Sequence, residues 1–181
     1  MRLPERSAGQ TRIGVAVRVP EPFAAVLEDA RRRSGDPFAD VIPPHVTLLG
    51  PTVVDIARLD DVHAHLAGVA AHAAPFDMLL RGSGTFRPVS PVVFVQVAAG
   101  IAECERLEQA IRTGPLDQDL RFNYHPHVTV AHEVPDDALD AAFEDMAGFE
   151  AAFRVTAVDL FEHGDDGVWR TVQTFGLRAT A

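Results

Sequence analysis

The hydrophobic positions of the chain recur in two rhythms, one typical of strands and the other of helices. Alternation of apolar and other residues predicts strands at 11–19, 45–49, 76–80, 92–97, 127–130, 153–161 and 168–175. Apolar residues three and four positions apart predict helices at 23–33, 55–73, 101–111 and 136–146. Glycine-containing stretches predict a flexible turn at 81–84 and a hairpin turn at 164–167.

The order of these elements repeats once along the chain. Shifted by about 82 residues, each half contains a strand, a helix, a strand, a helix and a strand, and residues 27–30 resemble residues 107–110. Two copies favour a two-lobed fold over a solenoid. We therefore predict an α+β fold, a bilobal pseudo-twofold duplication of two mostly antiparallel sheets around a central cleft, with helices outside. Residues 1–181 would form one domain, with 1–10 as a flexible tail.

A short phrase occurs at the same place in both halves. Pro-His-Val-Thr-Leu stands at 44–48 and Pro-His-Val-Thr-Val at 126–130. Residues two apart in a strand point to the same side. His45 and Thr47 should therefore share one face of their strand, and His127 and Thr129 one face of theirs, with aliphatic residues on the other side.

Composition and charge limit the function classes. A chain of 181 residues with 47% hydrophobic and 23% charged residues is typical of a globular protein, and no apolar run is long enough to span a membrane. The basic residues are all arginine, which excludes P-loop lysine and Schiff-base chemistry. A net charge of −10 argues against non-specific binding of long nucleic acid. The single cysteine, Cys104, and the polar N-terminus lead us to expect a cytoplasmic protein, and we expect a monomer.

Two imidazoles facing one site suit acid–base catalysis near neutral pH. One imidazole would take a proton from a nucleophile and the other would protonate the leaving oxygen, as in-line displacement at phosphorus requires. Threonine hydroxyls would donate hydrogen bonds to the non-bridging phosphate oxygens. This chemistry needs no metal or other cofactor, and the near-symmetric pair leaves the acid and the base unassigned.

The paired phrases, in residues 43–51 and 125–132, resemble those of the 2H phosphoesterase superfamily, in the 2'-5' RNA ligase and cyclic nucleotide phosphodiesterase branch. The resemblance implies catalytic roles for His45 and His127, with Thr47 and Thr129 binding substrate. It implies opening of a 2',3'-cyclic or related phosphate on a small nucleotide or RNA end. One departure concerns the position after the second phrase, where RNA-processing members often carry arginine. Here the residues are Ala131 and His132, which argues against a polymeric RNA substrate.

Four further residues are predicted to bind substrate. Residues 84–87 resemble the loop of the family that approaches the cleft, where Phe86 would stack on a base and Arg87 would hold a phosphate. Core packing of Phe86 and a solvated Arg87 remain equally compatible with the sequence. Tyr124 and His125 precede the second phrase, and His125 would share a strand face with His127.

Two other classes of protein stay open on the sequence. The same fold could hold a nucleotide or phosphate without turnover, as a binding module. A metal protein would need a histidine cluster, for which His125 and His127 offer two ligands. His63, His65 and His72 fall on a helix without acidic or cysteine partners, and we interpret them as surface residues. His132 and His163 remain unassigned.

Overall fold

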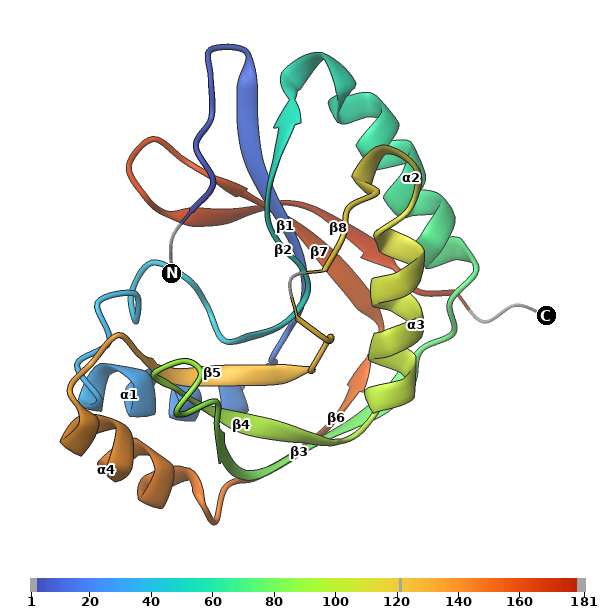
Figure 1. Cartoon of the computed structure of the whole chain (residues 1–181). Coiled ribbons are helices and arrows are strands. Elements are labelled where there is room, and N and C mark those ends of the chain that lie inside the picture. The colour runs from blue at the N-terminus through green and yellow to red at the C-terminus, as the bar shows by residue number, and fades with distance from the viewer. Residues whose placement is uncertain (1–2, 121, 179–181) are drawn as a thin grey trace.

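The computed structural model describes residues 3–120 and 122–178 (Figure 1). Its strands are β1 (Gln10–Arg18), β2 (His45–Asp55), β3 (Phe76–Thr85), β4 (Val92–Ala99), β5 (His127–His132), β6 (Glu150–Val155), β7 (Ala157–His163) and β8 (Trp169–Gly176). Its helices are α1 (Phe23–Arg33), α2 (Leu59–Ala71), α3 (Ile101–Ile111) and α4 (Asp136–Met146), with short 3-10 turns η1 (Ile56–Arg58) and η2 (Gly114–Leu116). The predicted helices are confirmed within a few residues, and the strands depart from prediction in three places.

The strands form two antiparallel sheets of four strands each, which confirms the predicted α+β class. The first, here called sheet A, has the order β2-β1-β7-β8, and the second, sheet B, has the order β5-β4-β3-β6. Each motif strand lies at one edge of its sheet. The motif strands β2 and β5 are in contact with each other, so the edges that carry the two phrases meet.

The two halves of the chain exchange elements between the sheets. β3, from the first half, pairs with β4 and β6 in sheet B, whereas β7, from the second half, pairs with β1 in sheet A. The helices exchange as well: α1 packs with α4 against β5, whereas α3 packs against β2 and against α2, which contacts β8. Figure 1 shows these two helix pairs on different sides of the molecule. Each lobe is therefore built from both halves.

Three strand predictions were wrong in their bounds. The strand predicted at 153–161 is two strands, because β6 ends at Val155 in sheet B and β7 begins at Ala157 in sheet A. The turn predicted at 81–84 lies inside β3, where a break in the pairing with β4 accommodates Gly82, while Gly84 pairs with Phe94. The strand begun by the first phrase runs on through Gly50 to Asp55, because bulges rather than a turn accommodate this stretch.

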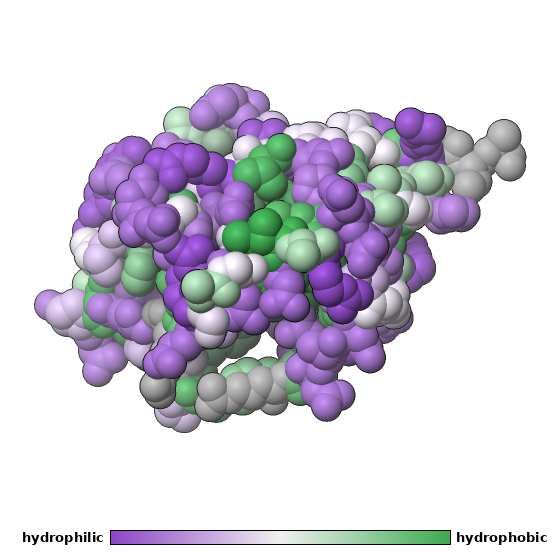
Figure 2. All heavy atoms as spheres, turned by 90° about the horizontal axis from the view of Figure 1, so that it is seen from above, coloured by the Kyte–Doolittle hydropathy of each residue, from purple (hydrophilic) through white to green (hydrophobic). Residues whose placement is uncertain are grey.

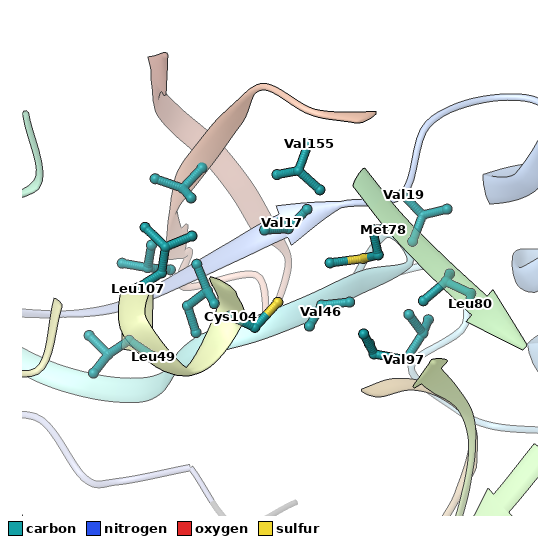
Figure 3. Close-up of a cluster of buried hydrophobic side chains, with 14 of the residues drawn as sticks. Val17, Val19, Val46, Leu49, Met78, Leu80, Val97, Cys104, Leu107 and Val155 are labelled. Carbon is teal, nitrogen blue, oxygen red and sulfur yellow. The ribbon is translucent and has the colours of Figure 1, made fainter. Parts of the chain in front are cut away.

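One hydrophobic core joins the two sheets. Buried side chains of β1 and β2 meet those of β3, β4 and β6, together with residues of all four helices. In Figure 3, Val17 and Val46 from sheet A lie near Met78 from sheet B, Val19 lies near Leu80, and Cys104 of α3 lies beside Val46. Because this core covers one face of each sheet, the opposite faces are left to carry the polar residues of the two phrases.

The segment predicted as a flexible tail contacts the rest of the domain over its described part. Arg12 donates from Nε to the carbonyl of Pro4 at 2.6 Å, and Arg6 pairs with Asp165 of the last hairpin. Leu3 packs against a small cluster formed by Ala16, Phe161 and Trp169.

Seen from above, the surface is largely hydrophilic, with a small apolar group near its centre (Figure 2). Within 3–120 and 122–178, no helix combines the length and apolar character needed to cross a membrane.

Candidate active site

The two phrases form the first residues of the strands β2 and β5. In β2, Val46 and Leu48 are buried while His45 and Thr47 are half-buried. β5 shows the same alternation, with Val128 buried between its half-buried histidine and threonine. Each strand thus has a buried aliphatic face and a half-buried histidine–threonine face, as the alternation predicts. We call the histidine–threonine side of each sheet its open face.

A bulge follows the threonine in both motif strands. Thr47 pairs with Ala16 and Leu49 with Val15, so Leu48 is an extra residue in β2. In β5, Thr129 pairs with Phe94 and Ala131 with Val93, so the residue between them is extra. A bulge re-aims the side chains that come after it. It places His132, the register partner of Val92, on the same open face as Thr129.

Both histidines are oriented by the same backbone contact. The Nδ1 atom of His45 lies 2.7 Å from the carbonyl oxygen of Pro43, and that of His127 lies 2.7 Å from the carbonyl oxygen of His125. A carbonyl oxygen only accepts, so Nδ1 carries the proton in each ring. In the neutral form, Nε2 is then an unprotonated base, and in the charged form it is a proton donor.

The polar atoms that face the site have no partner within the described chain. No hydrogen bond joins the hydroxyl of Thr47 or Thr129, or the Nε2 of either motif histidine, to another of the described residues. Other threonine hydroxyls are engaged, for example that of Thr85 with the carbonyl of Val92 at 2.8 Å. Two donors of hydrogen bonds and two proton-transfer atoms are therefore free for a ligand.

Aromatic rings surround His127. Its ring centroid lies 5.0 Å from those of Phe86 and Phe94, with Phe86 edge-on, and 6.1 Å from that of His125. The two phenylalanines are themselves 4.4 Å apart. Gly84 makes this packing possible, because a Cβ there would lie only 2.5 Å from the Phe94 ring. The structure thus brings the predicted residues Phe86 and His125 to the second motif.

The surroundings of His45 include a hollow. A hollow lies beside His45 and Thr47 on the open face of sheet A. Its lining is mainly apolar: Gly14, Val15, Ala16, Ile42, Leu49, Gly50, Pro51, Phe161 and Trp169. The Phe161 ring lies 6.3 Å from the His45 ring, whereas Gly14 and Ala16 provide a floor of small residues. An apolar wall next to polar groups is typical of a small-molecule site.

Burial lowers the pKa of both motif histidines. The pKa of His127 falls to about 4, chiefly through loss of hydration, with a smaller contribution from the charges of His125 and His45. The pKa of His45 is lowered by burial and by the nearby Arg31 cation. The two histidines stand on strands that contact each other. Both are neutral near pH 7 when no ligand is bound.

Arg87 and Tyr124 are placed differently from the other predicted residues. The Arg87 guanidinium donates to Asp140 of α4 at 2.6 Å and lies 3.7 Å from Asp136. It is thereby drawn to the helix rather than to the motif histidines. Tyr124 donates from its hydroxyl to the backbone carbonyl of Thr47 at 2.9 Å. Burial raises the pKa of Tyr124, so the hydroxyl keeps its proton. The hydrogen bond links the segment before β5 to the first motif strand, β2.

The remaining histidines are dispersed. His72 is exposed on the surface, as predicted, whereas His65 is half-buried and its Nε2 lies 3.0 Å from the carbonyl of Ile111. His163 is buried against Trp169, 5.0 Å between ring centroids. No group of three or more His, Cys, Asp or Glu side chains with the geometry of a metal site occurs in the described part of the chain.

Sequence reasoning did not find several residues of the open faces. Phe94, Phe161 and Trp169 are ordinary strand aromatics in the sequence, and their place beside the histidines depends on strand pairing. Arg18 was missed as well. It ends the alternating strand β1, and its register partner across the sheet is His45. The alternation of apolar residues at 13, 15, 17 and 19 was the available signal, because it puts residue 18 on the opposite face.

Comparison with known proteins decides the family. The sequence model of the 2'-5' RNA ligase superfamily matches residues 19–167, which include both phrases. The chain belongs to the 2'-5' RNA ligase superfamily. A relative from Halalkalibacterium halodurans, named "Putative phosphoesterase BH1439", is 28% identical over 166 residues, covering 91% of this chain and 96% of its own.

Two solved structures share the fold. TT0787 of Thermus thermophilus matches with a TM-score of 0.62 at 26% identity, over 94% of this chain and 100% of that one. E. coli LigT in complex with 3'-AMP matches with a TM-score of 0.63 at 17% identity, over 93% and 98%. The predicted superfamily is therefore confirmed, and family and fold together support an enzyme of the phosphoesterase, 2'-5' RNA ligase-like type.

Proposed function

We propose that the protein is a phosphodiesterase that opens a 2',3'-cyclic or related cyclic phosphate on a nucleotide or RNA end. The observation that carries this proposal is the set of unpartnered atoms on the meeting edges of the two sheets. Nε2 of His45 and of His127 and the hydroxyls of Thr47 and Thr129 form no hydrogen bond with the described residues. Two proton-transfer groups and two hydroxyl donors are what displacement at a phosphate requires.

The proposed reaction balances with water as the only co-substrate. One neutral imidazole accepts a proton at Nε2 from water, whose oxygen forms a bond to phosphorus. The bond from phosphorus to the 3'-oxygen breaks, and the second imidazole, protonated at Nε2, gives its proton to that oxygen. The product carries a 2'-phosphate. The threonine hydroxyls donate to the non-bridging oxygens and hold the phosphate in line.

The lowered pKa values add a condition to this mechanism. With both rings neutral in the free site, one imidazole must gain a proton before it can act as the acid. A bound phosphate anion raises the pKa of a neighbouring histidine, because it stabilises the charged form. Substrate binding would therefore be accompanied by uptake of about one proton near pH 7.

The aromatic surfaces support a nucleotide as the substrate. The hollow beside His45 has Phe161 and Trp169 in its lining, and the second motif has Phe86 and Phe94 beside it. Aromatic rings stack on nucleobases without sequence preference. E. coli LigT, which has this fold, was solved with 3'-AMP, so adenosine nucleotides are suitable first probes.

The test is hydrolysis of adenosine 2',3'-cyclic phosphate with product identification, in the presence of EDTA. We expect the 2'-phosphate from the wild type and loss of turnover in His45→Ala and His127→Ala. Exposed His72, at the C-terminal end of α2, gives the matched control, and His72→Ala should retain the wild-type rate. Equal rates in all four proteins would refute the proposal, and tight binding without product would indicate a binding module instead.

A further inference from the structure

Arg18, the register partner of His45, lies on the open face of sheet A. Residues 12, 14, 16 and 18 of β1 alternate onto this face, because Ala16 pairs with Thr47 and Arg18 pairs with His45. Directly opposed residues in an antiparallel pair have Cβ atoms only about 4.5–5.5 Å apart. The Cβ atom of Arg18 is therefore the one in β1 that lies closest to the Cβ atom of His45.

The buried carboxylate of Asp159 fixes the position of the Arg18 side chain. Its Nε donates to Oδ2 of Asp159 at 2.6 Å, and its Nη2 donates to Oδ1 at 3.5 Å. The Asp159 side chain is 4% exposed, whereas the Arg18 side chain is 50% exposed. The hydroxyl of Thr174 also donates to Asp159, which fixes the carboxylate. The guanidinium is thus anchored on one edge and open to solvent on the other.

Much of the hydrogen-bonding capacity of Arg18 is unused. A guanidinium has five N–H donors, and within 3–120 and 122–178 the only side chain that accepts a hydrogen bond from Arg18 is Asp159. Arg31 and Arg87 differ in this respect. Arg31 is buried against Asp36, with 9% of its side chain exposed, and Arg87 is held by two exposed carboxylates of α4. Arg18 combines an anchored guanidinium, open donors and a register position opposite a motif histidine.

We propose that Arg18 is a specificity-determining residue that binds a phosphomonoester of the substrate, distinct from the cyclic phosphate between His45 and His127. This inference rests on the proposed function and narrows it to substrates with a second phosphate close to the cyclic one. The planar guanidinium matches two phosphate oxygens at once. The chain carries a net charge of −10, so an anion meets attraction only where a cation such as Arg18 is fixed.

The test compares two stable ligands that differ only in the second phosphate. Adenosine 2',5'-bisphosphate and adenosine 2'-monophosphate are titrated by calorimetry into the wild type, Arg18→Gln, Arg18→Lys and Arg170→Gln. We expect the wild type to bind the bisphosphate about tenfold more tightly, and Arg18→Gln to bring the two affinities within about twofold of each other. Arg18→Lys should retain part of the difference. Arg170, an exposed arginine of β8 paired with Asp166, is the control that should keep it.

A double variant controls for a loss of affinity that is caused by unfolding of Arg18→Gln. Arg18→Gln leaves Asp159 buried without its cation, so the double variant Arg18→Gln with Asp159→Asn removes both charges. The inference is overturned if the wild type binds neither ligand or both equally, or if the affinity ratio survives in Arg18→Gln and in the double variant. Because these are binding measurements, they are independent of turnover. A failed hydrolysis assay with His45→Ala and His127→Ala would instead count against the proposed function.

Discussion

The two motif strands carry the same phrase in different surroundings. Both histidines bond through Nδ1 to the carbonyl two residues earlier at 2.7 Å, and both strands bulge after the threonine. Yet His127 is packed 5.0 Å from two phenylalanine rings, whereas His45 borders a hollow floored by Gly14 and Ala16. The duplicated phrase determines how each imidazole is aimed. The rest of each sheet determines what lies next to it.

Because of this difference, the open faces of sheets A and B can bind different parts of a ligand. Sheet A has a hollow beside its histidine and Arg18 as the register partner of that histidine, whereas sheet B has two packed phenylalanine rings beside its own. A near-symmetric pair of proton-transfer groups thus lies between two unlike surfaces. We infer that a substrate is oriented by these surfaces rather than by the histidines, since the histidines are locally equivalent.

The largest expected effect comes from removing either histidine. His45→Ala and His127→Ala should each lower kcat by about 10²–10⁴-fold, because one proton transfer is lost in each case. The double variant should lose little more than the worse single variant, since the two groups act in one step. Steady-state kinetics on adenosine 2',3'-cyclic phosphate measure this. Losses that multiply in full would contradict a concerted pair.

Stability should fall as the solution is acidified below about pH 6.5. The unfolded chain protonates His127 near 6.5, but the folded pKa is about 4, so the unfolded state binds more protons between these values. The contribution of His127 is complete above pH 6.5 and is lost as the pH falls toward 4. At pH 5 we expect a loss of about 1–2 kcal/mol, allowing for the partial solvent contact of the ring.

Urea unfolding at pH 7 and pH 5 measures that loss. His127→Gln lacks the titrating group, so its stability should depend less steeply on pH than that of the wild type. His45 contributes with the same sign, because its pKa is also lowered. A wild type and a His127→Gln variant with parallel pH dependences would show that the ring is not desolvated.

The aromatic wall can be opened to test the contrast between the motifs. Phe86→Ala should admit water to His127 and raise its pKa toward 6.5, by about one unit, because desolvation is the main cause of the shift. Phe161→Ala is the matched change beside His45, where the ring centroids are 6.3 Å apart. NMR titration of the histidine ring protons reports each site separately. An unchanged His127 pKa in Phe86→Ala would assign the shift to other neighbours.

The smallest expected effect concerns the link between the two motif regions. Tyr124→Phe removes the hydrogen bond to the Thr47 carbonyl and should cost about 1 kcal/mol of unfolding free energy. If Tyr124 also positions Thr47, kcat should fall a few-fold with little change in KM. Thermal denaturation and kinetics of the same variant separate the two roles. A changed KM with constant kcat would indicate that the Tyr124 hydroxyl contacts substrate instead.

The sequence by itself determined the local geometry of the site. Period-two alternation put His45 with Thr47 and His127 with Thr129, and the repeat predicted two antiparallel sheets that bring the phrases together. These features depend on neighbours along one strand, which a linear pattern records. The match to the superfamily has the same origin, since both phrases lie within the matched residues 19–167.

Only the tertiary structure decided which side chains surround the histidines. No pattern in the sequence indicated that residues 153–161 divide between two sheets, that α1 lies beside β5, or that Arg18 pairs with His45. Strand register and the bulges after Thr47 and Thr129 are set by packing between segments far apart in the chain. Such contacts leave no local period to detect. The phrase that aims each imidazole was therefore visible in the sequence, while the surfaces that select a substrate were not.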